Sequence, residues 1–442
     1  MPNLINCCCY NCAIRLISMD IKGDSLSVFT KTSLEKEYTN RAILLLLFLI
    51  CPLASFVVSL FFLNKKISNV TLFLFIVLFA YSMTNIDTEG PDLNRYLEYP
   101  QNCATYNSFI ELVTSYDFVI SGGDYYRALM GFLVSRFTTN GHILMALLGM
   151  VWAILYIKSK SLFDIYKCDR KDSSYVLLLL FFFAYGVAHL GNVRFPTAAL
   201  LFFYSSIKYL HTRKVKYLLI LCLVPLFHSA FIIYDFLFLV TVLFPKNVRM
   251  YFIFLLLAFV VKKLNVISGF TFVLNYLPNS LALKYASYAL DENYLANSVA
   301  ASEVASLHVK YMYVLIELSS LWIIINVFFK KKMLYDTIDA SIACFLLLLY
   351  ICYYLSPLAN DVNQRTLHLS LLFIYYLCYK IWARNKVNYL YRTYLLILMC
   401  ASIPMLFYNL KLMLYFTKVD MIYESLPSLI LNDSMRTIIT NM

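Results

Sequence analysis

Five ionisable residues stand at or near the ends of apolar stretches, and their types are those that bind anions or transfer protons: Asp92, Arg95, Arg194, His228 and Arg365. A guanidinium group binds an anion through paired, charge-assisted hydrogen bonds, and a carboxylate or an imidazole can take up a proton. An arginine at the centre of a membrane helix costs about 2.5 to 3.5 kcal/mol, so it usually has an anionic partner or a wet cavity. If the chain brings these residues to one side of a membrane, they predict a polar site.

Two polar turns carry the later arginines. Arg194 lies in the turn His189–Pro196, where Pro196 can open a helix within its first turn. Arg365 follows a turn with amide and carboxyl side chains that suit hydroxyl-rich ligands, namely Asn360, Asp361, Asn363 and Gln364. Taken alone, each arginine is equally well explained as a side chain that reaches headgroup phosphates, and His228 as a hydrogen-bonded helix histidine. The five residues together favour a site.

The composition is that of an integral membrane protein. Of the 442 residues, 61% are hydrophobic and 14% are charged, and the mean hydropathy is +0.71. This leaves too little polar surface to coat a soluble globule. The net charge of +12 is expected to lie in short cytoplasmic loops, so membrane lipids are expected partners and nucleic acid is not.

The first 40 residues differ from the rest of the chain. Residues 1–40 lack the continuous apolar core of a signal peptide, and we predict a poorly ordered N-terminal extension. Its cysteines, Cys7, Cys8, Cys9 and Cys12, are of a type that binds metal or carries lipid. Because no second cluster has zinc-like spacing, we expect no metal site. No nucleotide-binding loop or other cofactor motif occurs, so we expect no cofactor.

The spacing of apolar runs predicts an all-α, polytopic helical bundle. A run of about 20 residues can span the hydrocarbon core of roughly 30 Å as a helix. Such runs, some of them short, lie near 41–63, 69–86, 141–157, 175–190, 195–211, 249–263, 309–329, 338–356, 366–382 and 393–414. The segment 217–244 is too long for one crossing, and we predict a hairpin of short helices with its apex near Phe227, His228 and Ser229.

Basic loops orient the predicted spans, because short loops rich in lysine and arginine stay in the cytoplasm. With the hairpin at 217–244, the basic loops near 65, 158–171, 213–216, 246–249, 330–332 and 384–392 are all internal. This gives about 12 crossings with both chain ends outside, and it places the five ionisable residues on the external side. Lys262 and Lys263 fit less well, because this topology makes them external.

The external side then has two long segments, 87–140 and 264–308, and the membrane domain extends over 41–414 with an external tail at 415–442. The first segment is acidic, and its apolar stretch Tyr125–Phe137 predicts a helix at the membrane interface. Its tyrosines fit two interpretations. They anchor the segment at headgroup depth, which composition alone favours, or they stack on the apolar faces of sugars.

Four motifs resemble, in order, spacing and sidedness, those of EpsG-type O-antigen polymerases, the Wzy proteins. They are Asp92-Leu93-Asn94-Arg95-Tyr96, the run Asn192–Ala198, Leu226-Phe227-His228-Ser229-Ala230, and Arg365 before a late apolar run. The similarity covers about residues 41 to 400. One motif departs from the family, which often has a tyrosine pair after the acidic residue where this chain has Arg95-Tyr96-Leu97.

The resemblance implies a glycosyltransferase of the bacterial inner membrane that joins undecaprenyl-pyrophosphate-linked oligosaccharide units on the periplasmic face. Arg194, Arg365 and Arg95 would then bind pyrophosphate, and His228 or Asp92 would act as the catalytic base. Tyr96, Asn192 and Asn363 would contact saccharide. The arginines would stabilise the leaving group, so no metal ion is required. The resemblance also leaves room for a polysaccharide chain-length regulator as a partner.

Two other functions compete with the polymerase. An O-antigen ligase uses the same lipid-linked donor and a similar external site, but one dominant late external loop would favour it. A lipid-linked oligosaccharide flippase, which is not an enzyme, would be expected to show an internal repeat and charges at mid-membrane depth. The sequence shows neither feature.

Overall fold

The computed structural model describes residues 43–61, 66–84, 91–115, 118, 124–163, 185–244, 247–263, 337–355 and 360–384, together with 407, 409, 411 and 413. All elements in this part of the chain are helices, which confirms the predicted all-helical class. They are α3 (Pro52–Phe61), α4 (Lys66–Tyr81), α5 (Pro91–Ala104), α6 (Phe109–Thr114), α8 (Tyr125–Ser135), α9 (Gly141–Ser161), η2 (Val187–Asn192), α11 (Arg194–Thr212), α12 (Val215–Phe227), α13 (Phe231–Leu243), α14 (Val248–Lys263), α19 (Thr337–Leu355) and α20 (Asn360–Arg384).

The helices follow the predicted apolar runs closely. The runs 141–157, 195–211 and 338–356 correspond to α9, α11 and α19 with ends that differ by a few residues. The run 41–63 is divided, because the helix that ends at Ile50 is followed by α3, which begins at Pro52. The extension 1–40, the segment 264–308, the tail 415–442 and most of the runs 175–190, 309–329 and 393–414 lie outside the described residues.

By length and composition, two helices in the described part are suited to cross a membrane. They are α9, with 21 residues, and α19, with 19 residues. Four apolar helices are shorter, among them α12 and α13. A helix rises about 1.5 Å per residue, so the 13 residues of α12 or of α13 extend only about 20 Å, less than the hydrocarbon core.

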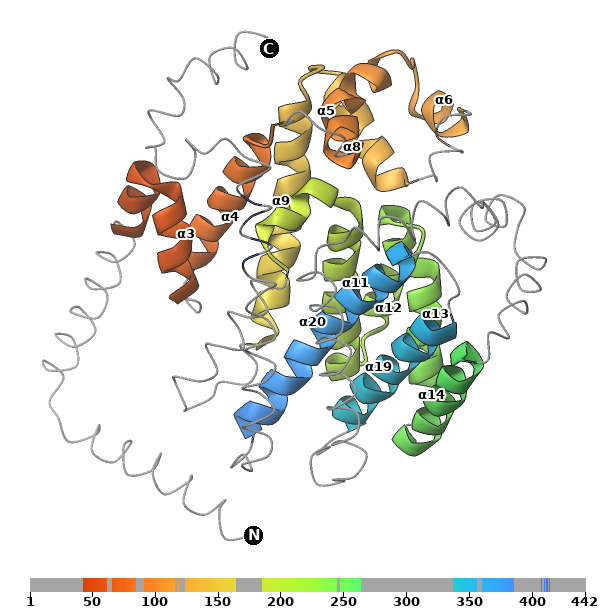
Figure 1. Cartoon of the computed structure of the whole chain (residues 1–442). Coiled ribbons are helices and arrows are strands. Elements are labelled where there is room, and N and C mark those ends of the chain that lie inside the picture. The colour runs from red at the N-terminus through yellow and green to blue at the C-terminus, as the bar shows by residue number, and fades with distance from the viewer. Residues whose placement is uncertain are drawn as a thin grey trace, which may run out of the picture.

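Long helices pack alongside one another in a bundle (Figure 1). Here α9 packs against α4 and α11, α11 packs against α12, and α19 packs against α13, α14 and α20. The centre of the bundle is aromatic: the ring of Phe202 on α11 lies within about 6 Å of four other rings, on α13, α19 and α20, which are Phe231, Phe238, Phe345 and Phe373. These ring contacts hold α11, α13, α19 and α20 together.

Three further helices, α5, α6 and α8, gather at one end of the bundle (Figure 1). The segment 87–140, predicted as a long external loop, is therefore helical over much of its described length. A variant of the capping box begins α6: the N–H of Glu111 donates to Oγ of the N-cap Ser108, and Glu111 accepts from the N–H of Asn107, one residue before the N-cap. A small core of Cys103, Leu112, Phe118 and Ala128 joins these helices. The predicted interface helix Tyr125–Phe137 corresponds to α8.

The segment 217–244 forms two short helices, as predicted. They are α12 and α13, and the break between them is at His228, Ser229 and Ala230. Arg213, with φ 55°, makes the left-handed turn that joins α11 to α12. The break at His228 thus lies towards the end of the bundle at which α11 begins, as the ring contact between Phe195 and His228 shows.

Candidate functional site

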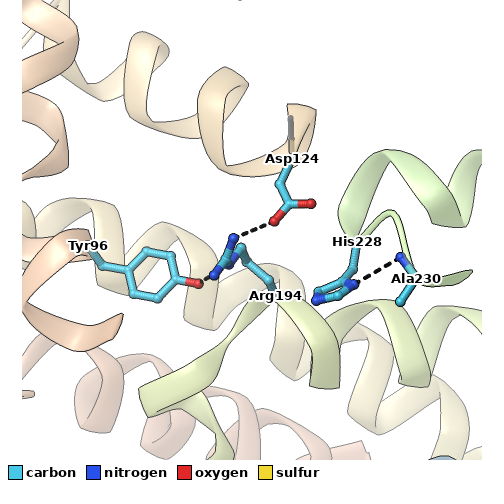
Figure 2. A network of polar contacts seen from close by, with 5 residues as sticks. All are labelled: Tyr96, Asp124, Arg194, His228 and Ala230. Atoms are coloured by element: carbon cyan, nitrogen blue, oxygen red, sulfur yellow. Dashed lines mark hydrogen bonds and ion pairs between the residues drawn. The ribbon is translucent and has the colours of Figure 1, made fainter. Parts of the chain in front are cut away.

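Arg194 is the centre of a polar network at the junction of the bundle with α5 and α8 (Figure 2). Its Nη1 forms an ion pair with Oδ2 of Asp124, and its Nε donates a hydrogen bond of 2.8 Å to the hydroxyl of Tyr96. The side chain of Arg194 retains 15% exposure, whereas Asp124 is 3% exposed. Two side chains that are far from Arg194 in sequence, Tyr96 and Asp124, therefore hold its guanidinium group in place while leaving part of it accessible.

Local sequence explains why Arg194 lies at the beginning of a helix. The 3-10 helix η2 ends at Asn192, and α11 begins at Arg194 with Pro196 in its first turn, where the missing N–H costs no hydrogen bond. The hydroxyl of Thr197 donates to the carbonyl of Val193 at 2.6 Å. No side chain caps this helix end, so its partial positive charge adds to that of the guanidinium. The region attracts an anion.

Asp124 was not predicted as a site residue. It is the N-cap of α8, but its side chain makes no capping hydrogen bond and reaches Arg194 instead. Its second oxygen, Oδ1, is buried and has no hydrogen-bond partner among the described residues. Figure 2 shows this oxygen turned away from the guanidinium. A buried carboxylate oxygen without a partner is costly, and such an atom marks a place where a ligand group can bind.

Tyr96, predicted to contact saccharide, is buried at 1% exposure. Its hydroxyl accepts from Arg194, and its ring centroid is 6.0 Å from the guanidinium carbon. The predicted contact with saccharide stays a prediction. The observed contacts give Tyr96 the role of holding Arg194.

His228 lies in the break between α12 and α13, next to the network (Figure 2). Its Nδ1 accepts a hydrogen bond of 3.3 Å from the N–H of Ala230, and the ring packs edge to face against Phe195 at 5.5 Å. The side chain is 8% exposed. Because Nδ1 acts as an acceptor, the neutral ring carries its proton on Nε2. In this tautomer Nε2 of His228 acts as a donor and not as an acceptor.

An aromatic contact joins α8 to the same break. The rings of Tyr126 and Phe227 stack with centroids 4.5 Å apart. The Tyr126 hydroxyl is buried and has no hydrogen-bond partner among the described residues, and burial raises its pKa well above the ordinary value. The stacked rings of Tyr126 and Phe227 thus connect α8 directly to the turn that carries His228.

Arg365 lies in the second turn of α20 and is partly buried. The next residue, Thr366, shares a hydrogen bond of 3.0 Å with the hydroxyl of Tyr234 on α13, and the rings of His368 and His189 stack at 5.5 Å. The beginning of α20 therefore packs against α13 and η2, the elements that follow His228 and precede Arg194. Arg365 belongs to the same end of the bundle.

The other predicted residues are Arg95, Asn192, Asp92 and Asn363. Arg95 on α5 and Asn192 at the end of η2 are exposed. Asp92 is in the first turn of α5 and Asn363 in the first turn of α20, but their side chains lie outside what the structure describes. The roles predicted for these four residues therefore stay predictions.

A second polar cluster holds α5 against α8. The guanidinium of Arg127 lies 4.6 Å from the ring centroid of Tyr99, and Nη2 of Arg136 donates to the carbonyl of Cys103 at 2.9 Å. Burial raises the pKa of Tyr99 to about 12, although Arg127 acts in the opposite direction. Burial also raises the pKa of the Cys103 thiol to about 11. This cluster fixes the platform from which Tyr96 and Asp124 reach Arg194.

No protein-family model, curated protein or solved structure matches the chain.

Asp124 could have been found from the sequence by one signal. An arginine near a membrane needs an anionic partner, and Asp124 directly precedes the apolar stretch that forms α8. However, the segment 87–140 has several acidic residues, and spacing alone does not distinguish them. The partner is selected by the fold, because the packing of α5 and α9 and of α8 and α12 brings only certain side chains to the beginning of α11.

Proposed function

We propose that this chain is an O-antigen or related surface polysaccharide polymerase. It joins undecaprenyl-pyrophosphate-linked oligosaccharide units at the periplasmic face of a bacterial inner membrane. The observation that carries the proposal is the accessible guanidinium of Arg194, held by Asp124 and Tyr96 beside His228. The order of the motifs around these residues, which resembles that of EpsG-type polymerases, supports the same assignment.

The proposed topology has about 12 crossings with both chain ends outside, and α5, α6 and α8 lie on the external side. Two helices suited to cross a membrane and several shorter apolar helices support a multi-pass arrangement. The short helices α12 and α13 meet at His228, so their break reaches the level of the site without a full crossing of either helix.

Arginine chemistry suits the proposed donor. The pyrophosphate leaves as an anion, and the planar fork of arginine matches phosphate oxygens with two parallel hydrogen bonds. Arg194 and Arg365 bind this group, and they stabilise the charge that develops as it departs. The reaction then needs no metal ion. His228 donates a hydrogen bond through Nε2 to the bound donor or acceptor.

A deletion of the gene tests the assignment. We expect lipopolysaccharide capped with a single repeat unit, because units are flipped and ligated but not joined. A ligase deletion would leave the lipid core without any cap, and a flippase deletion would trap units inside the cell. The polysaccharide ladder on a gel distinguishes the three outcomes. Unchanged long chains would refute the polymerase.

A further inference from the structure

We propose that Asp124 is the catalytic base of the transfer and that it becomes available when the donor's diphosphate takes over Arg194. This inference rests on the proposed function. It assigns the proton-accepting role to a carboxylate that the sequence did not identify. It also implies an order, in which the donor binds before Asp124 can act on the acceptor.

Asp124 and a diphosphate compete for the same group. The carboxylate forms an ion pair with Nη1 of Arg194, and the Tyr96 hydroxyl occupies Nε. We infer that the incoming diphosphate forms its paired hydrogen bonds through Nη1 and Nη2 and displaces the Asp124 oxygen from Nη1. In the structure the carboxylate therefore stands where a phosphate oxygen of the donor would bind.

The displaced carboxylate has two features of a poised base. Oδ1 is buried and without a partner among the described residues, and the side chain of Asp124 makes no capping hydrogen bond to α8. Once displaced from Arg194, the carboxylate oxygens can accept a proton from the acceptor hydroxyl. Donor binding thus converts Asp124 from the partner of Arg194 into a proton acceptor next to the anomeric carbon.

His228 is less suited to this role, because its Nδ1 already accepts from the backbone of Ala230. Its Nε2 carries the proton and donates. The hydroxyl of Tyr126, also buried without a partner in the described part, lies two residues from Asp124 and is a further donor for the acceptor sugar.

The chemical step balances without a co-reactant. The oxygen of the acceptor hydroxyl forms a bond to the anomeric carbon of the donor sugar. The bond between that carbon and the pyrophosphate oxygen breaks, and its electron pair leaves with undecaprenyl pyrophosphate. The hydroxyl proton goes to Asp124 and then to water.

Two measurements on Asp124→Asn test this proposal. The first is the binding of undecaprenyl pyrophosphate to the purified full chain in detergent. We expect about tenfold tighter binding, because a neutral amide competes less well for Arg194. The second is chain extension in cells, which should fall about 10²-fold or more through the loss of the base. Glu98→Gln, which removes an exposed carboxylate from α5, is the matched control and should change neither quantity.

The outcomes separate this inference from the assignment of function. Normal extension, or weaker lipid binding, by Asp124→Asn would overturn the role of Asp124 and leave a polymerase with another base. Arg194→Gln tests the clamp separately: unchanged lipid binding and extension would refute the proposed function. Asp124→Glu keeps the negative charge that pairs with Arg194, so a loss of activity in this variant is not caused by loss of the ion pair. We expect extension at least about tenfold slower with this variant, and wild-type extension would overturn the inference.

Discussion

The hydroxyl of Tyr96 accepts a hydrogen bond from Nε of Arg194, and a substitution that removes a single oxygen atom tests this contact. Tyr96→Phe leaves the buried ring in place but removes the 2.8 Å hydrogen bond. A hydrogen bond to a charged group contributes about 1.5 kcal/mol or more, so we expect chain extension to slow about tenfold. Tyr125→Phe, at an exposed position at the start of α8, is the control. Equal rates in the two variants would mean that Tyr96 does not orient Arg194.

Arg365 tests whether the clamp extends beyond Arg194. Arg365→Ala should abolish chain extension while the protein still inserts, and Arg365→Lys should restore little, because lysine lacks the planar fork. Arg249→Ala, at an exposed position on α14, is the control. The polysaccharide ladder measures extension, and immunoblotting of membranes measures insertion. Full extension by Arg365→Ala would remove this residue from the clamp.

Cys103 reports on the packing of α5 against α8. With its pKa raised to about 11 by burial, roughly a thousandth of the thiol is ionised at pH 8, and thiolate is the form that reacts. We therefore expect Cys103 to resist iodoacetamide in the folded protein and to react after denaturation. Mass spectrometry of the alkylated peptide is the measurement. Rapid labelling at pH 8 before denaturation would contradict the buried position of Cys103.

At the residue scale, the sequence predicts some of the residues in the site, but it does not predict which residues they contact. The sequence predicts Arg194 and His228 because a polar residue near a membrane helix is costly. Arg194 is the centre of the network, and His228 lies next to it. Asp124 was missed and Tyr96 was given another role, because their contacts with Arg194 span 70 and 98 residues. Such pairings depend on tertiary packing, which spacing along the chain does not contain.

The contact between α5 and α9 depends on a glycine. A Cβ at Gly141 would lie 2.0 Å from the carbonyl oxygen of Leu97, and backbone cannot yield as a flexible side chain can. Gly141→Ala should push α5 away from α9, move Tyr96 off Arg194 and reduce extension. Gly149→Ala, which meets the Cβ of Ala80 on α4, should destabilise the bundle at a distance from the site.

Extension per folded molecule distinguishes the two glycine variants. Thermal unfolding of the solubilised chain measures the folded fraction. We expect both variants to lose stability, by about 1 to 3 kcal/mol for such overpacking. Only Gly141→Ala should also lose extension per folded molecule. An equal loss in both would mean that the contact supports the bundle and not the site.

A buried ion pair connects the first turn of α19 with the last turns of α20, and Arg365 lies near the other end of α20. Nζ of Lys380, 0% exposed, lies 2.5 Å from Oδ1 of Asp339, 1% exposed. Asp339→Leu leaves an unpaired buried charge and should cost about 3 to 5 kcal/mol, whereas Asp339→Leu combined with Lys380→Met should recover much of the loss. Thermal unfolding is again the measurement, with the exposed Lys216→Met as control. A double variant no more stable than Asp339→Leu would contradict this account of the pair.

Element boundaries were predictable where apolar runs are long or where a polar residue interrupts them. The division of 217–244 at His228 followed from its length and from the polar side chains at its middle. The helices α5 and α6 were not predicted, because a search for apolar runs detects membrane spans and not amphipathic helices. Pro100 within α5 further weakens the helical signal.

The sidedness of the whole molecule is a prediction from loop charges, and α11 offers a direct test. Asn192, before this helix, and Lys214, after it, are both exposed. The 19 residues of α11 separate them by about 28 Å. A membrane-impermeant maleimide should label Asn192→Cys in intact cells and Lys214→Cys only after permeabilisation, with the unsubstituted chain as background. The reverse pattern would place the site on the cytoplasmic face.

The central claim is that Arg194 grips the donor's diphosphate, and the polysaccharide ladder of cells that carry Arg194→Lys as their only copy tests it most directly. The exposed Arg249→Lys is the matched control. Lysine keeps the charge but cannot form the paired hydrogen bonds, so extension should fall about 10²-fold or more, with the protein still present in the membrane. A full-length ladder from Arg194→Lys would contradict the account.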